Sequence, residues 1–247
     1  MPANTECAVS TGSSVSQKEQ GNDTGDGIEL VGFSIVLVSS LNNPSIMNPD
    51  FLRHNNIVEA GRQLQGDPIS TPFYARVTFE GGLAVKAEPT RVIFEQDRKS
   101  LTTKTITCPA MAKRYLETVP HVPYTAVGIN PKGYRRSPQE VPEKVSTAFR
   151  NKGIWMSFKD VCPDIQLRAT YRYEQRRIAL DVTEAKNQGG NASTIHGILF
   201  QANIHRDVSA TNQQERIEKM EKILQSWKED LSDFFTLSKR FHFEEHA

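Results

Sequence analysis

Residues 217–234 read IEKMEKILQSWKEDLSDF, the strongest structural signal in the chain. Large apolar residues recur there at alternating steps of three and four, which is typical of an amphipathic helix with one narrow apolar stripe. The stripe consists of Ile217, Met220, Leu224, Trp227, Leu231 and Phe234. It spans fewer than three heptads, whereas a sustained coiled coil usually needs more. We therefore interpret the stripe as part of the chain's own core, with a protein-interaction surface as the alternative.

Composition narrows the class of protein. The 247 residues include 30 basic and 29 acidic side chains, and the formal net charge is +1. This balance argues against a dedicated nucleic-acid or membrane-surface protein, although a local patch remains compatible with it. Cys7, Cys108 and Cys162 are widely spaced, so they support neither a zinc ribbon nor a disulfide framework. Without a visible secretory signal or a membrane-length apolar run, we expect a soluble, cytoplasmic protein without a cofactor.

The chain divides into a tail and two halves. Residues 1–27 are polar and poor in apolar side chains, which predicts a disordered tail. The first α+β half covers 28–120, and the second covers 121–247 and ends in the long amphipathic helix.

Each half reads as strand, helix, three strands, helix. In the first half we expect a strand at 28–40, a hairpin at 73–79 and 83–87, and further extended pieces at 91–95 and 102–107, with helices after the cap Asn48 and from Pro109. In the second half we expect strands at 122–130, 165–173, 177–185 and 194–204 and a helix near 137–150. The terminal helix should start at Thr211, whose hydroxyl would form a capping box with Gln214.

The repeated order predicts an internal duplication, and two unrelated α+β segments are the alternative. Residues 33–38 (FSIVLV) also match residues 124–129 (YTAVGI) class by class. The expected fold is α+β, with a mainly antiparallel sheet covered on one face by helices. This order resembles that of helix-grip folds, a likeness of topology that implies no function.

Two basic segments suggest a nucleic-acid-binding alternative. The segment 168–177 combines arginines with Tyr171 and Tyr173, and the segment 132–136 reads as a basic loop after a strand. The candidate residues are Lys132, Arg135, Arg136, Arg168, Arg172, Arg176 and Arg177. Period-two alternation places Arg168 and Arg172 on one face of the strand and the two tyrosines on the other. This predicts that the tyrosines cap the core and that the arginines are solvated.

Catalytic and metal signals are weaker. His242 and His246 have a helical metal-ligand spacing but no glutamate in the position of a general base, so no metal site is predicted. Cys108 precedes a helix, which would favour its thiolate, yet nothing places His121 beside it. We therefore predict no catalytic residue and favour a non-enzymatic binding or assembly component. It would act through a sheet groove, a sheet edge or the terminal helix, with a protein, self or other, as partner. The alternatives are a nucleic-acid-associated protein and an enzyme whose active site lacks a sequence motif.

Overall fold

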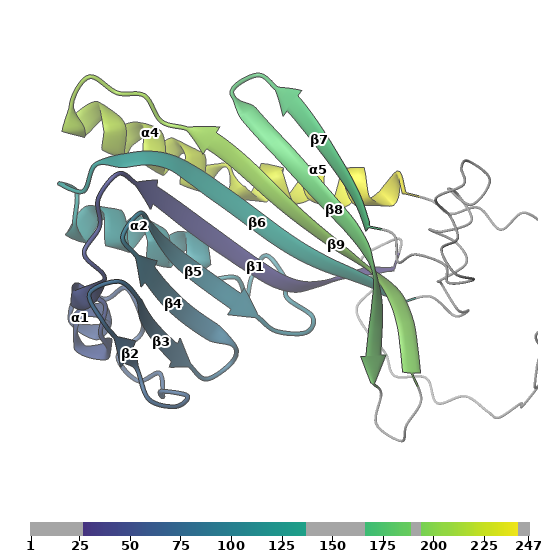
Figure 1. The fold of residues 1–247 in the computed structure, drawn as a ribbon, viewed down its shortest axis with the longest axis horizontal. Helices are drawn as coiled ribbons and strands as arrows, with labels where there is room; N and C mark the ends of the chain where they lie inside the picture. The colour runs from purple at the N-terminus through teal and green to yellow at the C-terminus, as the bar shows by residue number, and fades with distance from the viewer. Residues whose placement is uncertain (1–26, 137–165, 189–193, 242–247) are drawn as a thin grey trace, which may run out of the picture.

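The computed structural model describes residues 27–136, 166–188 and 194–241 (Figure 1). The expected disordered tail up to residue 26, the helix expected near 137–150, Cys162, His242 and His246 lie outside these residues.

The described residues form one nine-stranded sheet in the order β2-β3-β4-β5-β1-β6-β9-β8-β7, antiparallel at every pairing. The strands are β1 (Ile28–Ser39), β2 (Ile69–Ser70), β3 (Ala75–Phe79), β4 (Leu83–Glu88), β5 (Arg91–Asp97), β6 (Tyr124–Arg136), β7 (Gln166–Tyr173), β8 (Arg176–Gln188) and β9 (Thr194–Asp207). The helices are the short η1 (Pro44–Ile46), α1 (Pro49–His54), α2 (Cys108–Thr118), α4 (Gln213–Gln225) and α5 (Trp227–Lys239).

The helices cover one face of the sheet, which confirms the expected α+β class. In Figure 1 the strands lie in front of α2, α4 and α5. The ring of Phe51 in α1 packs edge-on against Tyr115 of α2, with 6.4 Å between ring centroids, so α1 lies on the same side. A single apolar core runs between the helices and the sheet, with Phe94, Tyr115, Ile129, Phe200 and Phe234 fully buried.

Local sequence accounts for most of the element boundaries. The Asn48 side chain accepts a hydrogen bond from the Phe51 N–H and caps α1. Gly81 and Gly82, both with positive φ, turn β3 into β4 as predicted. The extended piece expected at 102–107 was wrong. The Thr105 N–H donates to the Thr102 carbonyl, and the Thr105 hydroxyl bonds within the same turn, so local hydrogen bonds replace a ladder.

β1 and β6 form the centre of the sheet, with Ile35 opposite Ile129. From β1 the sheet continues through β5, β4 and β3, and from β6 it continues through β9, β8 and β7. The two halves therefore follow the same strand order outward from one seam and share one core. Common descent of the halves is not established by this order, so the duplication stays a prediction.

The terminal stripe lies inside the core, but not as one helix. α4 and α5 meet at Ser226, where the backbone leaves the helical conformation. Met220, Leu224, Leu231 and Phe234 are buried, and Trp227 packs edge-on against Phe33 with 5.5 Å between ring centroids. The predicted cap was one residue out, because Asn212 caps α4 by accepting from the Glu215 N–H.

Candidate binding face

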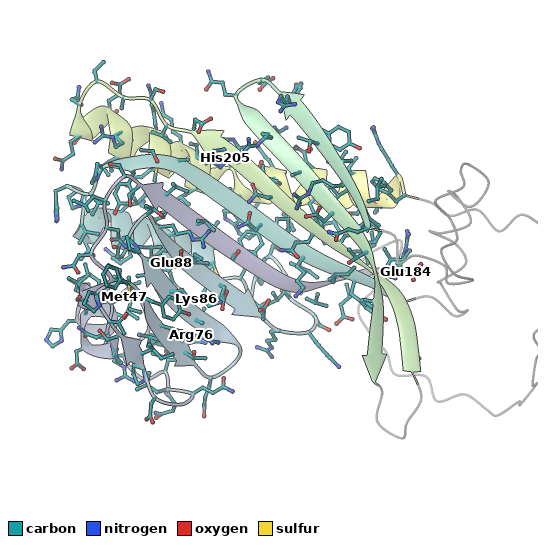
Figure 2. All side chains as sticks on the ribbon, viewed as in Figure 1. Met47, Arg76, Lys86, Glu88, Glu184 and His205 are labelled. Atoms are coloured by element: carbon teal, nitrogen blue, oxygen red, sulfur yellow. The ribbon has the colours of Figure 1, made fainter. Side chains whose placement is uncertain are left out.

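Strand alternation gives the sheet two different faces. One face carries the core and touches the helices, as Phe33 does. The opposite side, which we call the open face, carries Ser34, Asn130 and Gln201, and the Asn130 amide donates to the Ser34 hydroxyl at 3.3 Å. In Figure 2 the side chains of Lys86 on β4 and His205 on β9 lie on this face. Among the residues that the structure describes, no helix packs on the open face.

Five of the seven predicted basic residues share the open face, as their positions opposite known open-face partners show. They are Lys132, Arg136, Arg168, Arg172 and Arg177. Arg135 and Arg176 point to the helix-covered face instead. The structure therefore places most, but not all, of the predicted basic residues on one face, in separate rows of it.

The loop expected at 132–136 was wrong, because these residues continue the central strand β6. Pro131 and Gly133 are explained there by the neighbouring elements and not by a turn. The pairing of β6 with β9 is interrupted at Asn130 and Pro131, where proline has no N–H to donate. A side chain at Gly133 would come within 3.0 Å of the Phe234 ring, so glycine lets α5 approach the sheet.

Arg135 serves the core rather than a ligand. Its guanidinium lies 5.1 Å from the centroid of the Phe200 ring and donates to the Phe241 carbonyl at 2.7 Å. Burial lowers the pKa of Arg135 from its ordinary value. These contacts commit much of the Arg135 guanidinium to the helix-covered face.

Arg176 belongs to a buried ion-pair cluster that the sequence did not predict. Asp230 of α5 has no exposed surface, and Arg206 of β9 donates to it from its two terminal guanidinium nitrogens, at 2.6 and 2.7 Å. Arg176 of β8 bonds to Asp230 at 3.0 Å and to Asp233 at 2.7 Å. Although burial acts to lower the pKa of Arg176, the two carboxylates raise it overall.

This cluster fixes α5 to β8 and β9. Asp230 follows Trp227 by three residues and precedes Phe234 by four, so it lies on the buried side of the helix. A carboxylate in the middle of an apolar stripe was the one sequence signal that could have revealed the cluster. A cavity of about 490 Å³ beside it is lined by three cations and three carboxylates and has no net charge to select an ion. The cations are Arg176, Arg206 and Lys222, and the carboxylates are Glu174, Glu229 and Asp233.

A row of basic side chains crosses the open face at strands β7, β8 and β9. Arg172 lies directly opposite Arg177, and Arg177 lies directly opposite His205. Two rows away, Arg168 binds Asp181 with two hydrogen bonds of 2.6 and 2.7 Å, which hold the pKa of Arg168 above its ordinary value. No such carboxylate faces Arg172 or Arg177 among the described residues.

The tyrosines of β7 do not cap the core as expected. They lie on the helix-covered face, yet Tyr171 is 40% exposed and Tyr173 is 56% exposed. The reason is that β7 is the last strand of the sheet, whereas α5 contacts β6 and β9. The predicted alternation of arginines and tyrosines was correct, and the predicted burial of the tyrosines was not.

Cys108 does not have the properties of a nucleophile. It is fully buried, and its thiol donates to the Phe33 carbonyl at 3.6 Å. Burial raises the pKa of the Cys108 thiol, with smaller contributions from Glu95 and Asp97, so the thiolate expected at a helix start is disfavoured. His121 is exposed.

The first-half end of the open face contains a second hollow, of about 440 Å³. Arg76, Glu95 and Asp97 line it, and Lys86 bonds to Glu95 at 2.7 Å. Within the described part of the chain, no three histidine, cysteine, aspartate or glutamate side chains are placed to hold a metal ion.

The sequence matches no protein-family model and no curated protein. None of the helices in the described residues has the length and apolarity needed to cross a bilayer.

Proposed function

We propose that this protein is a non-enzymatic binding component whose binding surface is the open face of the sheet. One observation carries the proposal: within the described residues the helices all lie on one face, and the terminal stripe is used to cover that face. The opposite face is left as a broad, mostly polar surface that also includes the half-buried Val36, Val38, Ile93 and Leu199. A sheet face held rigid by a covered core is a suitable platform for a protein partner.

The open face differs from the three surfaces that the sequence suggested, which were a sheet groove, a sheet edge and the terminal helix. The side chains of the terminal stripe are packed inside the protein, so they could meet a partner only if α4 and α5 left the sheet. The open face needs no such rearrangement.

Site-specific photo-crosslinking in the native host tests the proposal. A photoreactive amino acid at Gln201 or Asn203, both exposed on the open face of β9, should give a covalent adduct with a partner protein. Matched positions at Gln225 and Ser232, exposed on the helices, should give none. Adducts from the helix positions alone, or from none of the four positions, would contradict the proposal.

Nucleic-acid binding is the second candidate, because five of the seven predicted basic residues do share one face. It predicts an affinity for single strands that falls with salt at a logarithmic slope of about −0.7 per phosphate contacted. Reversing Arg172 and Arg177 together should abolish that binding. Arg176 is unsuitable for this test, since reversing it would place like charges beside Asp230 and Asp233 and disrupt the fold. Binding that is insensitive to salt or to the Arg172 and Arg177 reversal would exclude this candidate.

A further inference from the structure

We infer that the partner of the open face presents an acidic polypeptide segment, which binds across the row formed by Arg172, Arg177 and His205. This inference rests on the proposed function and adds the chemistry of the partner.

The arginines on β7–β9 fall into two groups, those paired with a carboxylate of this chain and those without one. Arg168, Arg176 and Arg206 are each held by a carboxylate of this chain, and Arg168 and Arg206 each donate two hydrogen bonds to it. Arg172 and Arg177 are exposed and have no carboxylate partner among the described residues. Yet they face each other directly on neighbouring strands, where like charges repel. A carboxylate bound between them would remove that repulsion and use the same forked geometry.

Charge is distributed unevenly over the open face. The described side chains of β6–β9 on this face include five cations and two carboxylates, Asp181 and Asp207. Asp181 is engaged by Arg168, and Asp207 lies 3.0 Å from the His205 ring nitrogen. On β3–β5 the same face is balanced, with three cations and three carboxylates, and Lys86–Glu95 and Arg91–Glu88 are paired. An acidic partner is therefore attracted to the β6–β9 end of the face.

The aromatic residues of β6–β9 favour an acidic polypeptide over nucleic acid as the partner of the open face. Single strands need aromatic faces beside the cations, on which bases can stack. The tyrosines of β7 lie on the other face of the sheet. Among the described residues of β6–β9, one tyrosine, Tyr134, lies on the open face. Its ring covers Gly197, and a side chain at Gly197 would overlap that ring. Among the described residues of β6–β9, the open face thus supplies forked cations beside one tyrosine ring rather than a row of aromatic faces.

The test uses the full-length protein and two polyanionic probes, poly-L-glutamate and oligo(dT), each labelled for fluorescence anisotropy. The first variant reverses the row (Arg172→Glu with Arg177→Glu). The control variant reverses two exposed basic residues outside the sheet (Arg98→Glu with Lys104→Glu), so that the net charge changes equally. A third variant, Arg172→Lys with Arg177→Lys, keeps the charge and removes the fork.

We expect poly-L-glutamate to bind more tightly than oligo(dT). The row reversal should weaken poly-L-glutamate binding at least about tenfold, the lysine pair should weaken it less, and the control should change it less than about twofold. Tighter binding of oligo(dT) through the same arginines would replace the inference with nucleic acid. Equal loss in row and control variants, or no binding of poly-L-glutamate, would overturn it. If crosslinks from Gln201 persist in that case, the proposed function stands and only the acidic partner is rejected.

Discussion

Among single residues, Asp230 should contribute most to stability through charge. Replacing Asp230 with asparagine would leave Arg176 and Arg206 partly buried without their shared counter-ion. We expect the free energy of unfolding in urea to fall by about 3–5 kcal/mol. Asp233→Asn is the matched control, because Asp233 is 40% exposed and should cost at most about 1 kcal/mol. Equal losses in the two variants would show that the buried position has no special weight.

The pair of Arg172 and Arg177 leads to the opposite expectation. Arg172→Glu replaces cross-strand repulsion with attraction, so the variant should be more stable than the natural protein by about 0.2–1 kcal/mol. Thermal or urea unfolding measures the difference, with Arg98→Glu, at an exposed arginine outside the strands, as the control. A loss of stability in Arg172→Glu would mean that the two guanidinium groups do not repel each other in the folded protein.

Cys108 makes stability depend on alkaline pH. An unfolded thiol has a pKa of about 8.5, and burial raises the pKa of Cys108 in the folded protein. Folding therefore favours the protonated thiol. Its contribution to stability is complete below about pH 8.5 and is lost as the pH rises beyond it. Between about pH 8.5 and 10, the unfolding free energy of Cys108→Ala should decline less steeply than that of the natural protein. Parallel profiles would contradict this assignment.

Some residue assignments were accessible from the sequence and others were not. Alternation correctly placed Arg168 and Arg172 opposite the tyrosines. The same alternation separates the neighbours Arg176 and Arg177, although grouping by charge alone had put them in one site. The role of Arg206 could not be predicted from its neighbours in the sequence. It depends on the ion pair with Asp230, which forms only because α5 packs on β9.

For helices and strands, periodicity was the reliable guide, and end signals were less so. The stripe at 217–234 identified the cover of the core, but the break at Ser226 was not visible, since the apolar spacing continues across it. The Asn130-Pro131-Lys132-Gly133 run resembled a turn, and only the neighbours β1, β9 and α5 explain why a strand tolerates it there.

Trp227 tests whether the terminal stripe belongs to the core. Trp227→Glu would place a carboxylate against Phe33, so the unfolding free energy should fall by at least about 2 kcal/mol. Gln225→Glu, exposed on α4, is the control and should change little. Light scattering of both variants and of the natural protein completes the test. A Trp227→Glu protein that remains folded but dissociates from an oligomer would show that the stripe serves assembly instead.

At the level of the whole molecule, the α+β class and the helix-covered face could be predicted, because they follow from which segments are apolar and with what period. The strand order could not. It depends on β1 pairing with β6, two segments far apart in the chain, and no local pattern specifies that contact. The open face shared by five basic residues was hidden for the same reason.

Removal of the last two helices tests this architecture. A protein ending at residue 210 would expose the apolar side of β6 and β9, including the fully buried Ile129 and Phe200. Burying one large apolar side chain stabilises a fold by about 1.5–3 kcal/mol, and several are uncovered together. We expect an insoluble or self-associating product in size-exclusion chromatography. A soluble monomer that unfolds cooperatively would refute the assigned role of α4 and α5.

The seam between β1 and β6 also has a consequence during synthesis. β1 is translated first and can pair with β5 while later residues are still being added, but its other edge has no neighbour until β6 emerges. For that interval the nascent chain displays twelve residues of an apolar strand with unpaired backbone groups. Such edges recruit other chains. The newly made first half should therefore depend on chaperones until the second half joins it.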